Sequence, residues 1–310
     1  MTLGTGETKK VLYLRGGAFG DFILTLPSLS LLRSHYPCSE LHLACKPSVA
    51  RAIDGTRLID QVHDIDGRWM TEVLGGGEVS EGIKTLVGSY DLIISHLWDK
   101  DLKLRKFFEI HSGATFVQST TRPVNGSETH AGVQYSESLR SYFKADPVAP
   151  FRFGRMGGKS FEATVVIHPG SGSVDKNWPA DFWSQCVNEL LRRELKIDCL
   201  VGEAELERGL PDWITESASG VRVHEELPLD QVRDMMLQAG GFLGHDSGLA
   251  HLAAACELPG VVLWRNSDLK VWSPCFEGLK VVRDSSGEGA LDVANRLTNV
   301  LQGSRRHGEP

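Results

Sequence analysis

Residues 240–266, GGFLGHDSGLAHLAAACELPGVVLWRN, decide the fold that we expect for the second half of the chain. A short apolar strand at 242–244 runs into a helix at 249–256, and a second apolar strand follows at 261–264. Strands that alternate with helices in this way imply a parallel sheet that is covered by helices on both faces. The stretch therefore predicts an α/β fold.

The turn between the first strand and the helix, Asp246-Ser247-Gly248, predicts a binding site for an anion such as a diphosphate. Asp246 or Ser247 is expected to cap the helix, because a short side-chain oxygen accepts hydrogen bonds from its first free N–H groups. Gly248 lets a ligand approach the backbone with no Cβ in the way. The free N–H groups and the positive end of the helix dipole favour negative charge at the same place. A capped helix that binds no ligand is the alternative.

The same pattern of strand, turn and helix recurs along the rest of the chain. Strands are expected at 11–15, 41–45, 62–65, 91–95, 115–118, 164–168, 197–201, 221–223 and 279–282. Helices are expected at 21–35, 49–53, 135–143, 180–193, 204–215, 229–238 and 290–301, with a further charged helix that ends near 106. The first helix contains Pro27, and it is expected to kink or restart there.

A stretch with two prolines and three glycines, residues 146–159, predicts a linker between two domains. The domains would be residues 1–155 and residues 156–310. Because each half begins with an apolar strand, a glycine-rich turn and a helix, we expect two Rossmann-like domains that face each other across a cleft. The last helix, near 290–301, could pack back toward the N-terminal domain.

Composition places the chain among globular proteins, since 41% of its 310 residues are hydrophobic and 24% are charged. The net charge of −7 is uneven: residues 1–155 carry +1 and residues 156–310 carry −8. The acidic second half argues against general nucleic-acid binding.

No apolar run suits a membrane span or a signal peptide, so we expect a cytoplasmic protein. The six cysteines lie far apart with no CxxC, so no disulfide framework or metal site is expected.

The stretch 168–179, HPGSGSVDKNWP, is a second candidate site for a phosphate ligand. Small residues such as Ser171 and Gly172 leave the backbone open, and Lys176 supplies a positive charge that suits phosphate oxygens. A flexible loop with a solvated lysine is the alternative. Trp178 is expected to pack under the loop rather than to stack on a ligand.

Further side chains could contact a nucleotide. Glu203 or Glu205, which follow an expected strand, could accept hydrogen bonds from both hydroxyls of a ribose, although an acid at a helix N-terminus explains them equally well. Asp246 would be repelled by a diphosphate, so we expect it to accept from sugar hydroxyls, to pair with Lys176 or to cap the helix. His251 lies on another face of its helix, where it would orient the loop or pack in the core.

The turn after the first strand, RGGAFGD at 15–21, carries the candidate base. It matches neither GxGxxG nor a P-loop, so the sequence supports neither dinucleotide binding nor P-loop chemistry. Asp21 is either a helix N-cap or a carboxylate that is directed into the cleft as a general base.

In their order and separation these motifs resemble glycosyltransferase family 9, the ADP-heptose:lipopolysaccharide heptosyltransferases. The resemblance covers about residues 10–285. Its marks are VLYLRGGAFGD at 11–21 with LTLP at 24–27, HPGSGSVDKNWP at 168–179, LVGEAE at 200–205, and HDSGLAHLAAACELPGVVLW at 245–264 with WSP at 272–274. Two positions depart from the family pattern. Gly17-Ala18 stand where a pair of small hydroxyl residues is usual, and His245 precedes the Asp-Ser-Gly turn.

The resemblance implies a GT-B architecture, with the acceptor on the N-terminal domain and the nucleotide sugar on the C-terminal domain. It implies an inverting transfer, without a metal or other cofactor, from ADP-heptose to a saccharide acceptor such as the lipopolysaccharide inner core. By position, Asp21 matches the general base and Lys176 the residue that stabilises the leaving diphosphate. The positions that match further donor contacts are Ser171, Gly172, Asp246, Ser247, Gly248 and Leu249.

Two alternative functions stay open at this point. A protein-directed heptosyltransferase of the same family would act on serine hydroxyls, and a non-enzymatic nucleotide-binding protein would keep the fold without turnover. The presence of both Asp21 and Lys176 argues against the second. A lipid-linked acceptor would imply loose attachment to the inner face of the inner membrane, while the nucleotide base, the linkage and the oligomeric state stay open.

Overall fold

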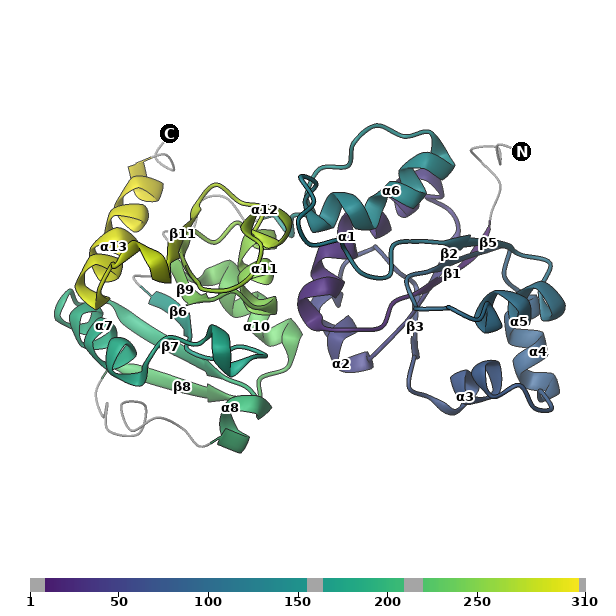
Figure 1. Cartoon of the computed structure of the whole chain (residues 1–310), viewed down its shortest axis with the longest axis horizontal. Coiled ribbons are helices and arrows are strands. Elements are labelled where there is room, and N and C mark those ends of the chain that lie inside the picture. The colour runs from purple at the N-terminus through teal and green to yellow at the C-terminus, as the bar shows by residue number, and fades with distance from the viewer. Residues whose placement is uncertain (1–8, 155–163, 209–219, 307–310) are drawn as a thin grey trace. The chain divides into compact units, whose positions relative to one another are not determined.

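The computed structural model describes residues 9–154, 164–208 and 220–306. The chain divides into two compact units, unit 1 (Met1–Phe151) and unit 2 (Arg152–Pro310), and each is considered by itself (Figure 1). The end of the expected helix at 204–215 and the second part of the expected linker at 146–159 lie outside the described residues. Within the described ranges, no helix is long and apolar enough to cross a membrane.

Unit 1 is built on a five-stranded parallel sheet in the order β3-β2-β1-β4-β5. The central strand β1 is buried from Val11 to Leu14, because the run VLYL presents apolar side chains to both faces of the sheet. The bounds of the strands are β1 Lys10–Leu14, β2 Glu40–Cys45, β3 Gln61–Asp64, β4 Leu92–Ser95 and β5 Thr115–Gln118.

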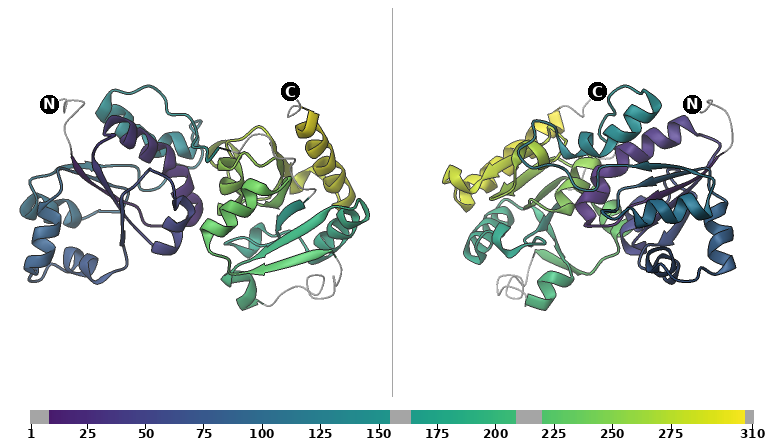
Figure 2. Two further views of the ribbon diagram at one scale, coloured as in Figure 1. Left: turned by 180° about the vertical axis from the view of Figure 1, so that it is seen from behind. Right: turned by 45° about the vertical axis from the view of Figure 1, so that its right-hand side comes forward.

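Helices cover both faces of this sheet, as Figure 1 and the further views in Figure 2 show. Helices α1 and α6 pack together on one face, whereas α3, α4 and α5 bury the side chains Met70, Val87 and Phe108 on the other. The bounds are α1 Phe19–His35, α2 Pro47–Ala50, α3 Arg68–Gly75, α4 Glu81–Gly88, α5 Lys103–His111 and α6 Ala131–Phe143, and a 3₁₀ turn at Arg51–Ile53 follows α2.

Of the two outcomes expected at Pro27, a kink or a restart, the restart is not found, because α1 runs through this residue as one helix. Proline removes one backbone hydrogen bond, but every residue from Phe22 to Leu29 is buried, so packing holds the helix in one piece. Helices α3 and α4 were not predicted at all. Their stretch contains Gly75-Gly76-Gly77 and many polar residues, which hide the helical period in the sequence.

Unit 2 contains a six-stranded parallel sheet in the order β11-β10-β9-β6-β7-β8. Both sheets place the first strand of their unit near the middle, and the chain crosses to its other side with the fourth strand. This topological switch point lies between β1 and β4 in unit 1 and between β6 and β9 in unit 2. The bounds are β6 Thr164–His168, β7 Lys196–Val201, β8 Val221–Glu225, β9 Gly241–His245, β10 Gly260–Trp264 and β11 Leu279–Arg283.

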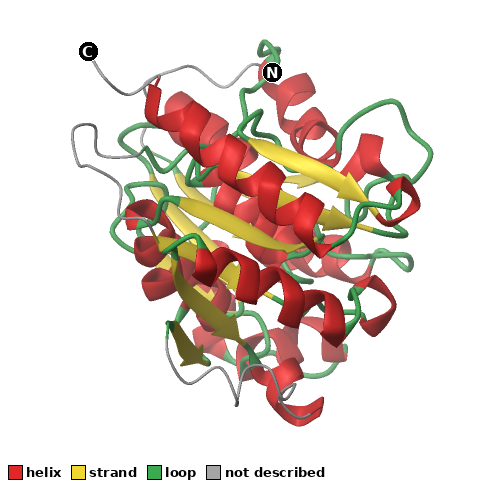
Figure 3. Cartoon of the chain, turned by 90° about the vertical axis from the view of Figure 1, so that its left-hand side faces the viewer, coloured by secondary structure: helices red, strands yellow, loops and turns green. Residues whose placement is uncertain are grey.

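The helices of unit 2 also form two layers around the strands (Figure 3). Helices α7 and α13 pack together on one face, and α10 and α11 lie on the other (Figure 1). Helix α13 packs in the core of unit 2, where Val293, Leu297 and Leu301 are buried. The sequence analysis had allowed this helix to pack toward the N-terminal domain instead. The bounds are α7 Ala180–Arg192, α8 Glu203–Arg208, α10 Leu229–Gln238, α11 Gly248–Ala255, α12 Leu269–Trp272 and α13 Ala290–Arg306.

Candidate functional site

At the switch point of unit 2, the loop after β6 meets the turn after β9. Nζ of Lys176 donates a hydrogen bond to Oδ2 of Asp246 at 2.6 Å, so the pairing that was one of three alternatives for Asp246 is the one observed. The Asp246 side chain is only 8% exposed, whereas that of Lys176 is 32% exposed. The buried carboxylate therefore holds the ammonium group in place, and part of the ammonium group remains exposed to a ligand.

The first turn of α11 is not capped by a side chain. Ser247 is the residue before the helix, but its hydroxyl makes no capping hydrogen bond, and no partner for the buried Oγ exists among the described residues. Asp246 instead accepts hydrogen bonds from Lys176 and from Ser267. The prediction of a side-chain cap is therefore wrong, because a cation and a hydroxyl compete for the carboxylate. The first N–H groups of the helix, including those of Gly248 and Leu249, have no intrahelical acceptor.

His245, the last residue of β9, holds both ends of the loop that carries Lys176. Its Nε2 lies 2.9 Å from the N–H of Trp178, and its Nδ1 lies 3.3 Å from the carbonyl oxygen of Gly170. Burial, with the nearby His168 as a second cause, lowers the pKa of His245 to about 3. The imidazole is thus neutral, with a proton on Nδ1 and an accepting Nε2. The sequence marked His245 as unusual but did not reveal this role.

We expect the protein to lose stability as the pH falls below 6.5. Burial lowers the pKa of His96 in unit 1 and of His245 in unit 2 from 6.5 to about 3. Both histidines are neutral in the folded state but take up a proton near pH 6.5 once unfolded, so the unfolded state gains protons first. Each histidine then removes about 1.4 kcal/mol per pH unit from the free energy of unfolding, down to its folded pKa.

Urea unfolding at a series of pH values between neutrality and about pH 5 measures this loss. The variant His245→Asn should show a shallower fall, because one proton-binding site of the unfolded chain is gone. A variant with the same pH dependence as the wild type would contradict the neutral, buried state of His245.

Residues after β10 brace the same loop from another side. Nη1 of Arg265 donates to the carbonyl oxygen of Asn177 at 2.8 Å, and its Nε is 2.9 Å from Oδ2 of Asp284. Nδ2 of Asn266 donates to the carbonyl oxygen of Asp175 at 3.2 Å. In the sequence these residues only follow an expected strand, and their role was not predicted, because their contacts lie 88 and 91 positions away in the chain. The loop is therefore held by tertiary contacts.

The small residues of the loop differ in exposure. Ser171 is buried, and its hydroxyl contacts the carbonyl oxygen of Ser173 at 2.6 Å and Oδ1 of Asn177 at 2.7 Å. Gly172 is exposed, with open space where a Cβ would stand. Trp178 is buried in the core under the loop, as predicted. The open backbone predicted for this loop is thus found at Gly172, whereas Ser171 shapes the loop from within.

The two acids after β7 have different surroundings. Glu203 is exposed. The side chain of Glu205 is only 13% exposed, with Oε2 3.0 Å from the N–H of Gly202 and 3.7 Å from Nε2 of His168. Burial acts to raise the pKa of Glu205, but the contacts with His168 and Gly202 outweigh it, so the pKa is lowered. A Cβ at Gly170 would clash with this carboxyl group, so a larger residue there would displace the Glu205 side chain.

Two residues of α11 complete the predicted set. Leu249 is half-buried in the first turn of the helix, and His251 is 6% exposed. The burial of His251 agrees with packing in the core, which was one of the two alternatives for this residue.

In unit 1, Asp21 lies in the first turn of α1, just beyond the carboxyl end of β1. Ala18 is the residue before the helix, so the interpretation of Asp21 as an N-cap is wrong. The side chain of Asp21 is 28% exposed, and its Oδ1 accepts from the hydroxyl of Tyr135 at 2.7 Å. Nη2 of Arg15 lies 3.9 Å from the same oxygen. A partly exposed, oriented carboxylate of this kind can accept a proton.

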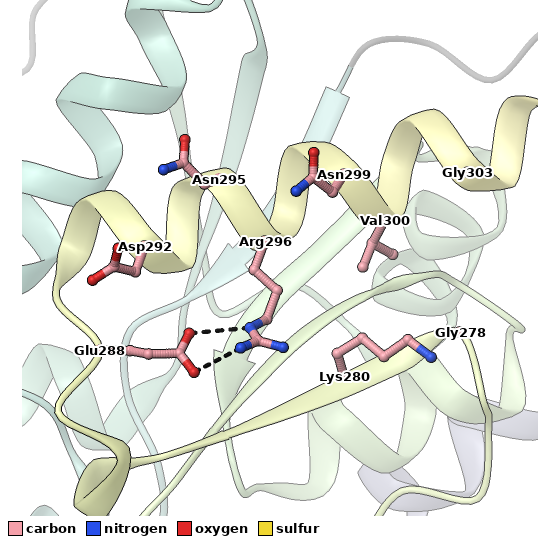
Figure 4. A pocket seen from close by; sticks show the side chains of 9 residues that line it. All are labelled: Gly278, Lys280, Glu288, Asp292, Asn295, Arg296, Asn299, Val300 and Gly303. Atoms are coloured by element: carbon pink, nitrogen blue, oxygen red, sulfur yellow. Dashed lines mark hydrogen bonds and ion pairs between the residues drawn. The ribbon is translucent and has the colours of Figure 1, made fainter.

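A groove of about 900 Å³ lies elsewhere in unit 2, between α13 and β11 (Figure 4). Of its two cations, Arg296 is neutralised by Glu288, at 2.7 Å between Nη2 and Oε1, and Nζ of Lys280 donates to the carbonyl oxygen of Glu277 at 2.8 Å. The groove is lined by the outer side of α13 and the edge strand, away from the switch point. We therefore do not assign the anion site to this groove. In the parts of the chain that the structure describes, no three His, Cys, Asp or Glu side chains are placed to hold a metal ion.

Comparisons with known proteins bear on this geometry. A family model described as glycosyltransferase family 9 (heptosyltransferase) matches residues 116–296. Lipopolysaccharide heptosyltransferase 3 of Escherichia coli K12 is 23% identical over 293 residues, which cover 84% of this chain and 83% of that protein.

Solved structures with a similar fold include ADP-heptose lps heptosyltransferase II of E. coli, with a TM-score of 0.75 at 15% identity over 96% of this chain and 99% of that one. A glycosyl transferase family 9 protein from Veillonella parvula has a TM-score of 0.74 at 15% identity, over 98% of this chain and 100% of that one. E. coli heptosyltransferase WaaC with ADP has a TM-score of 0.66 at 17% identity, over 97% and 100%.

These findings confirm the predicted fold class, two Rossmann-like α/β units of the GT-B type, and the predicted glycosyltransferase activity. The family model spans more than half of the chain. The chain belongs to glycosyltransferase family 9, the heptosyltransferases.

Proposed function

We propose that this chain is an inverting, metal-independent transferase that moves a heptose from ADP-heptose to a saccharide of the lipopolysaccharide inner core. The observation that carries the proposal is the pairing of Lys176 with Asp246 at the switch point of unit 2, beside the first turn of α11. In sheets of this kind, ligands bind beyond the carboxyl ends of the strands at the switch point. A cation together with free backbone N–H groups suits a diphosphate.

The donor would lie on unit 2. One of the three N–H bonds of the Lys176 ammonium group is used by Asp246, and the other two are available to phosphate oxygens. Asp246 then acts as a support for the cation and does not itself touch phosphate. Of the two acids after β7, Glu205 suits a ribose better than Glu203, because it is already fixed at the end of the strand by Gly202.

The acceptor would be activated by Asp21 of unit 1. Oδ2 of Asp21 takes the proton of an acceptor hydroxyl, whose oxygen forms a bond to the anomeric carbon. The bond from that carbon to the diphosphate oxygen breaks, and its electron pair leaves with ADP. Lys176 and the first turn of α11 stabilise the growing negative charge, so the proposed step uses no metal ion. A single displacement from the opposite face inverts the anomeric centre.

The identity of the acceptor rests on the relatives. The E. coli relative that covers most of this chain is a lipopolysaccharide heptosyltransferase. A lipid-linked acceptor would bring the chain to the inner face of the inner membrane by peripheral attachment.

A thermal-shift panel of ADP, UDP, GDP and CMP in the presence of EDTA tests the donor site. We expect ADP to raise the melting temperature, because a ligand that binds the native state stabilises it by about 2.7 kcal/mol at a hundredfold excess over Kd. The control is Lys280→Ala, a change in the groove beside α13, and ADP should raise the melting temperature of this variant as much as that of the wild type. A shift with UDP alone would contradict the assignment of ADP-heptose.

A further inference from the structure

The proposed base Asp21 accepts a hydrogen bond from the phenol of a buried tyrosine. The hydroxyl of Tyr135 in α6 lies 2.7 Å from Oδ1 of Asp21, across 114 positions of the chain. Tyr135 is 1% exposed, and burial raises its pKa, with the charge of Asp21 adding to this effect and that of Arg15 opposing it. The phenol therefore stays protonated, and it meets Oδ1 as a hydrogen-bond donor.

Arg15 holds the ring of Tyr135 from its face. The guanidinium carbon lies 4.7 Å from the ring centroid, a distance typical of a cation–π contact. The Arg15 side chain is 3% exposed, and its Nη2 is 3.9 Å from Oδ1 of Asp21. Neither Nε nor Nη2 has a hydrogen-bond partner among the residues described. Arg15 thus acts here through its stacking and its charge.

The backbone of Tyr135 is anchored as well. Its carbonyl oxygen lies 3.2 Å from the hydroxyl of Ser28 in α1 and 3.3 Å from the hydroxyl of Ser119 after β5. The ring of His96 meets that of Tyr135 edge-on at 5.8 Å, and His96 is itself held by the hydroxyl of Tyr13 at 2.7 Å. Because α1 also carries Asp21, these contacts fix the phenol and the carboxylate relative to each other.

The second oxygen of Asp21 faces a different environment. A Cβ at Gly17 would lie 3.7 Å from Oδ2, so this oxygen lies beside a backbone segment that carries no side chain. Gly17 has a φ of +91°, which side-chain-bearing residues rarely adopt. The turn therefore leaves room beside Oδ2 that a larger residue would fill, whereas Oδ1 is covered by Tyr135 and Arg15.

We infer that Tyr135 is a positioning residue that gives the two oxygens of Asp21 separate tasks. Oδ1 is held by the phenol, and Oδ2 is the oxygen that takes the proton of the acceptor hydroxyl. The inference rests on the proposed function, in which Asp21 is the base. Such support of a reacting group by a rigid neighbour is required for efficient catalysis.

The test uses Tyr135→Phe in the full chain, which removes only the hydroxyl. We expect the single-turnover rate of heptose transfer from ADP-heptose to a lipopolysaccharide inner-core acceptor to fall about tenfold. We also expect the KM for the acceptor to stay unchanged, because the phenol orients the base and does not contact the acceptor. The thermal shift by ADP should stay unchanged. The matched control is Tyr90→Phe, a buried tyrosine of the same unit whose hydroxyl contacts His42 and His63 instead.

An unchanged rate, or a lower rate that saturating acceptor restores, would overturn the inference. Asp21→Asn separates this failure from failure of the proposed function. If Asp21→Asn abolishes transfer while Tyr135→Phe transfers at the wild-type rate, the base assignment survives and the positioning role does not. If Asp21→Asn transfers at the wild-type rate, the base assignment itself is wrong.

A second pair of changes covers the case in which Tyr135→Phe does not fold. Ser28→Ala combined with Ser119→Ala removes both hydroxyl contacts to the Tyr135 carbonyl and leaves the phenol and Asp21 in place. We expect the transfer rate to fall here too, with an unchanged KM for the acceptor. A wild-type rate in the folded double variant would also contradict the positioning role.

Discussion

Asp21→Asn should lower the rate of heptose transfer by a factor of about 10² to 10⁴, which is the usual contribution of a general base. The amide has the same shape as the carboxylate and can still accept the hydroxyl of Tyr135, but it cannot take a proton from the acceptor. Binding of ADP should not change, because the proposed donor site lies on unit 2. Single-turnover transfer and the thermal shift by ADP measure the two effects separately.

Asp99→Asn is the matched control for this change. Asp99 accepts from the N–H groups of Leu104 and Arg105 at 3.0 and 2.9 Å, and it has no part in the proposed chemistry. Its replacement should leave the transfer rate unaltered. Wild-type transfer by Asp21→Asn would show that another group accepts the proton.

Lys176→Ala should weaken ADP binding by about 10- to 100-fold, the loss of one charge-assisted hydrogen bond to phosphate. The transfer rate should fall further, by about 10² to 10³, because the charge on the leaving diphosphate is largest in the transition state. Calorimetry with ADP and single-turnover transfer at saturating donor check the two numbers.

Part of this effect could come from Asp246, which the change leaves buried without its cation. The double variant Lys176→Ala with Asp246→Asn removes that stranded charge. If Lys176 contacts phosphate directly, the double variant remains impaired in transfer. Full recovery of both binding and transfer would contradict a direct contact.

Much of the fold could be predicted from the sequence, because central parallel strands are short apolar runs between turn residues. Each expected strand is present, with ends that differ by at most two residues. The misses have local causes. Helices α3 and α4 lie in a glycine-rich polar stretch, and the buried surroundings of α1 outweigh the helix-breaking tendency of Pro27.

The site was predictable only where its residues follow a strand end. Lys176 and Asp246 could be placed together, because the ends of β6 and β9 meet at the switch point. Tyr135 could not be connected with Asp21, since no local pattern joins residues 114 positions apart. The same holds for Ser267, whose hydroxyl donates to the carboxylate of Asp246 alongside Lys176. Local chemistry thus reveals the candidate groups, and tertiary contacts decide how they are held.

The most direct test of the account is mass spectrometry of a lipopolysaccharide inner-core acceptor after incubation with the wild-type chain, ADP-heptose and EDTA. The account predicts that the acceptor gains one heptose and that an equal amount of ADP appears. An acceptor of unchanged mass, beside a polypeptide acceptor that does gain heptose in the same assay, would contradict it.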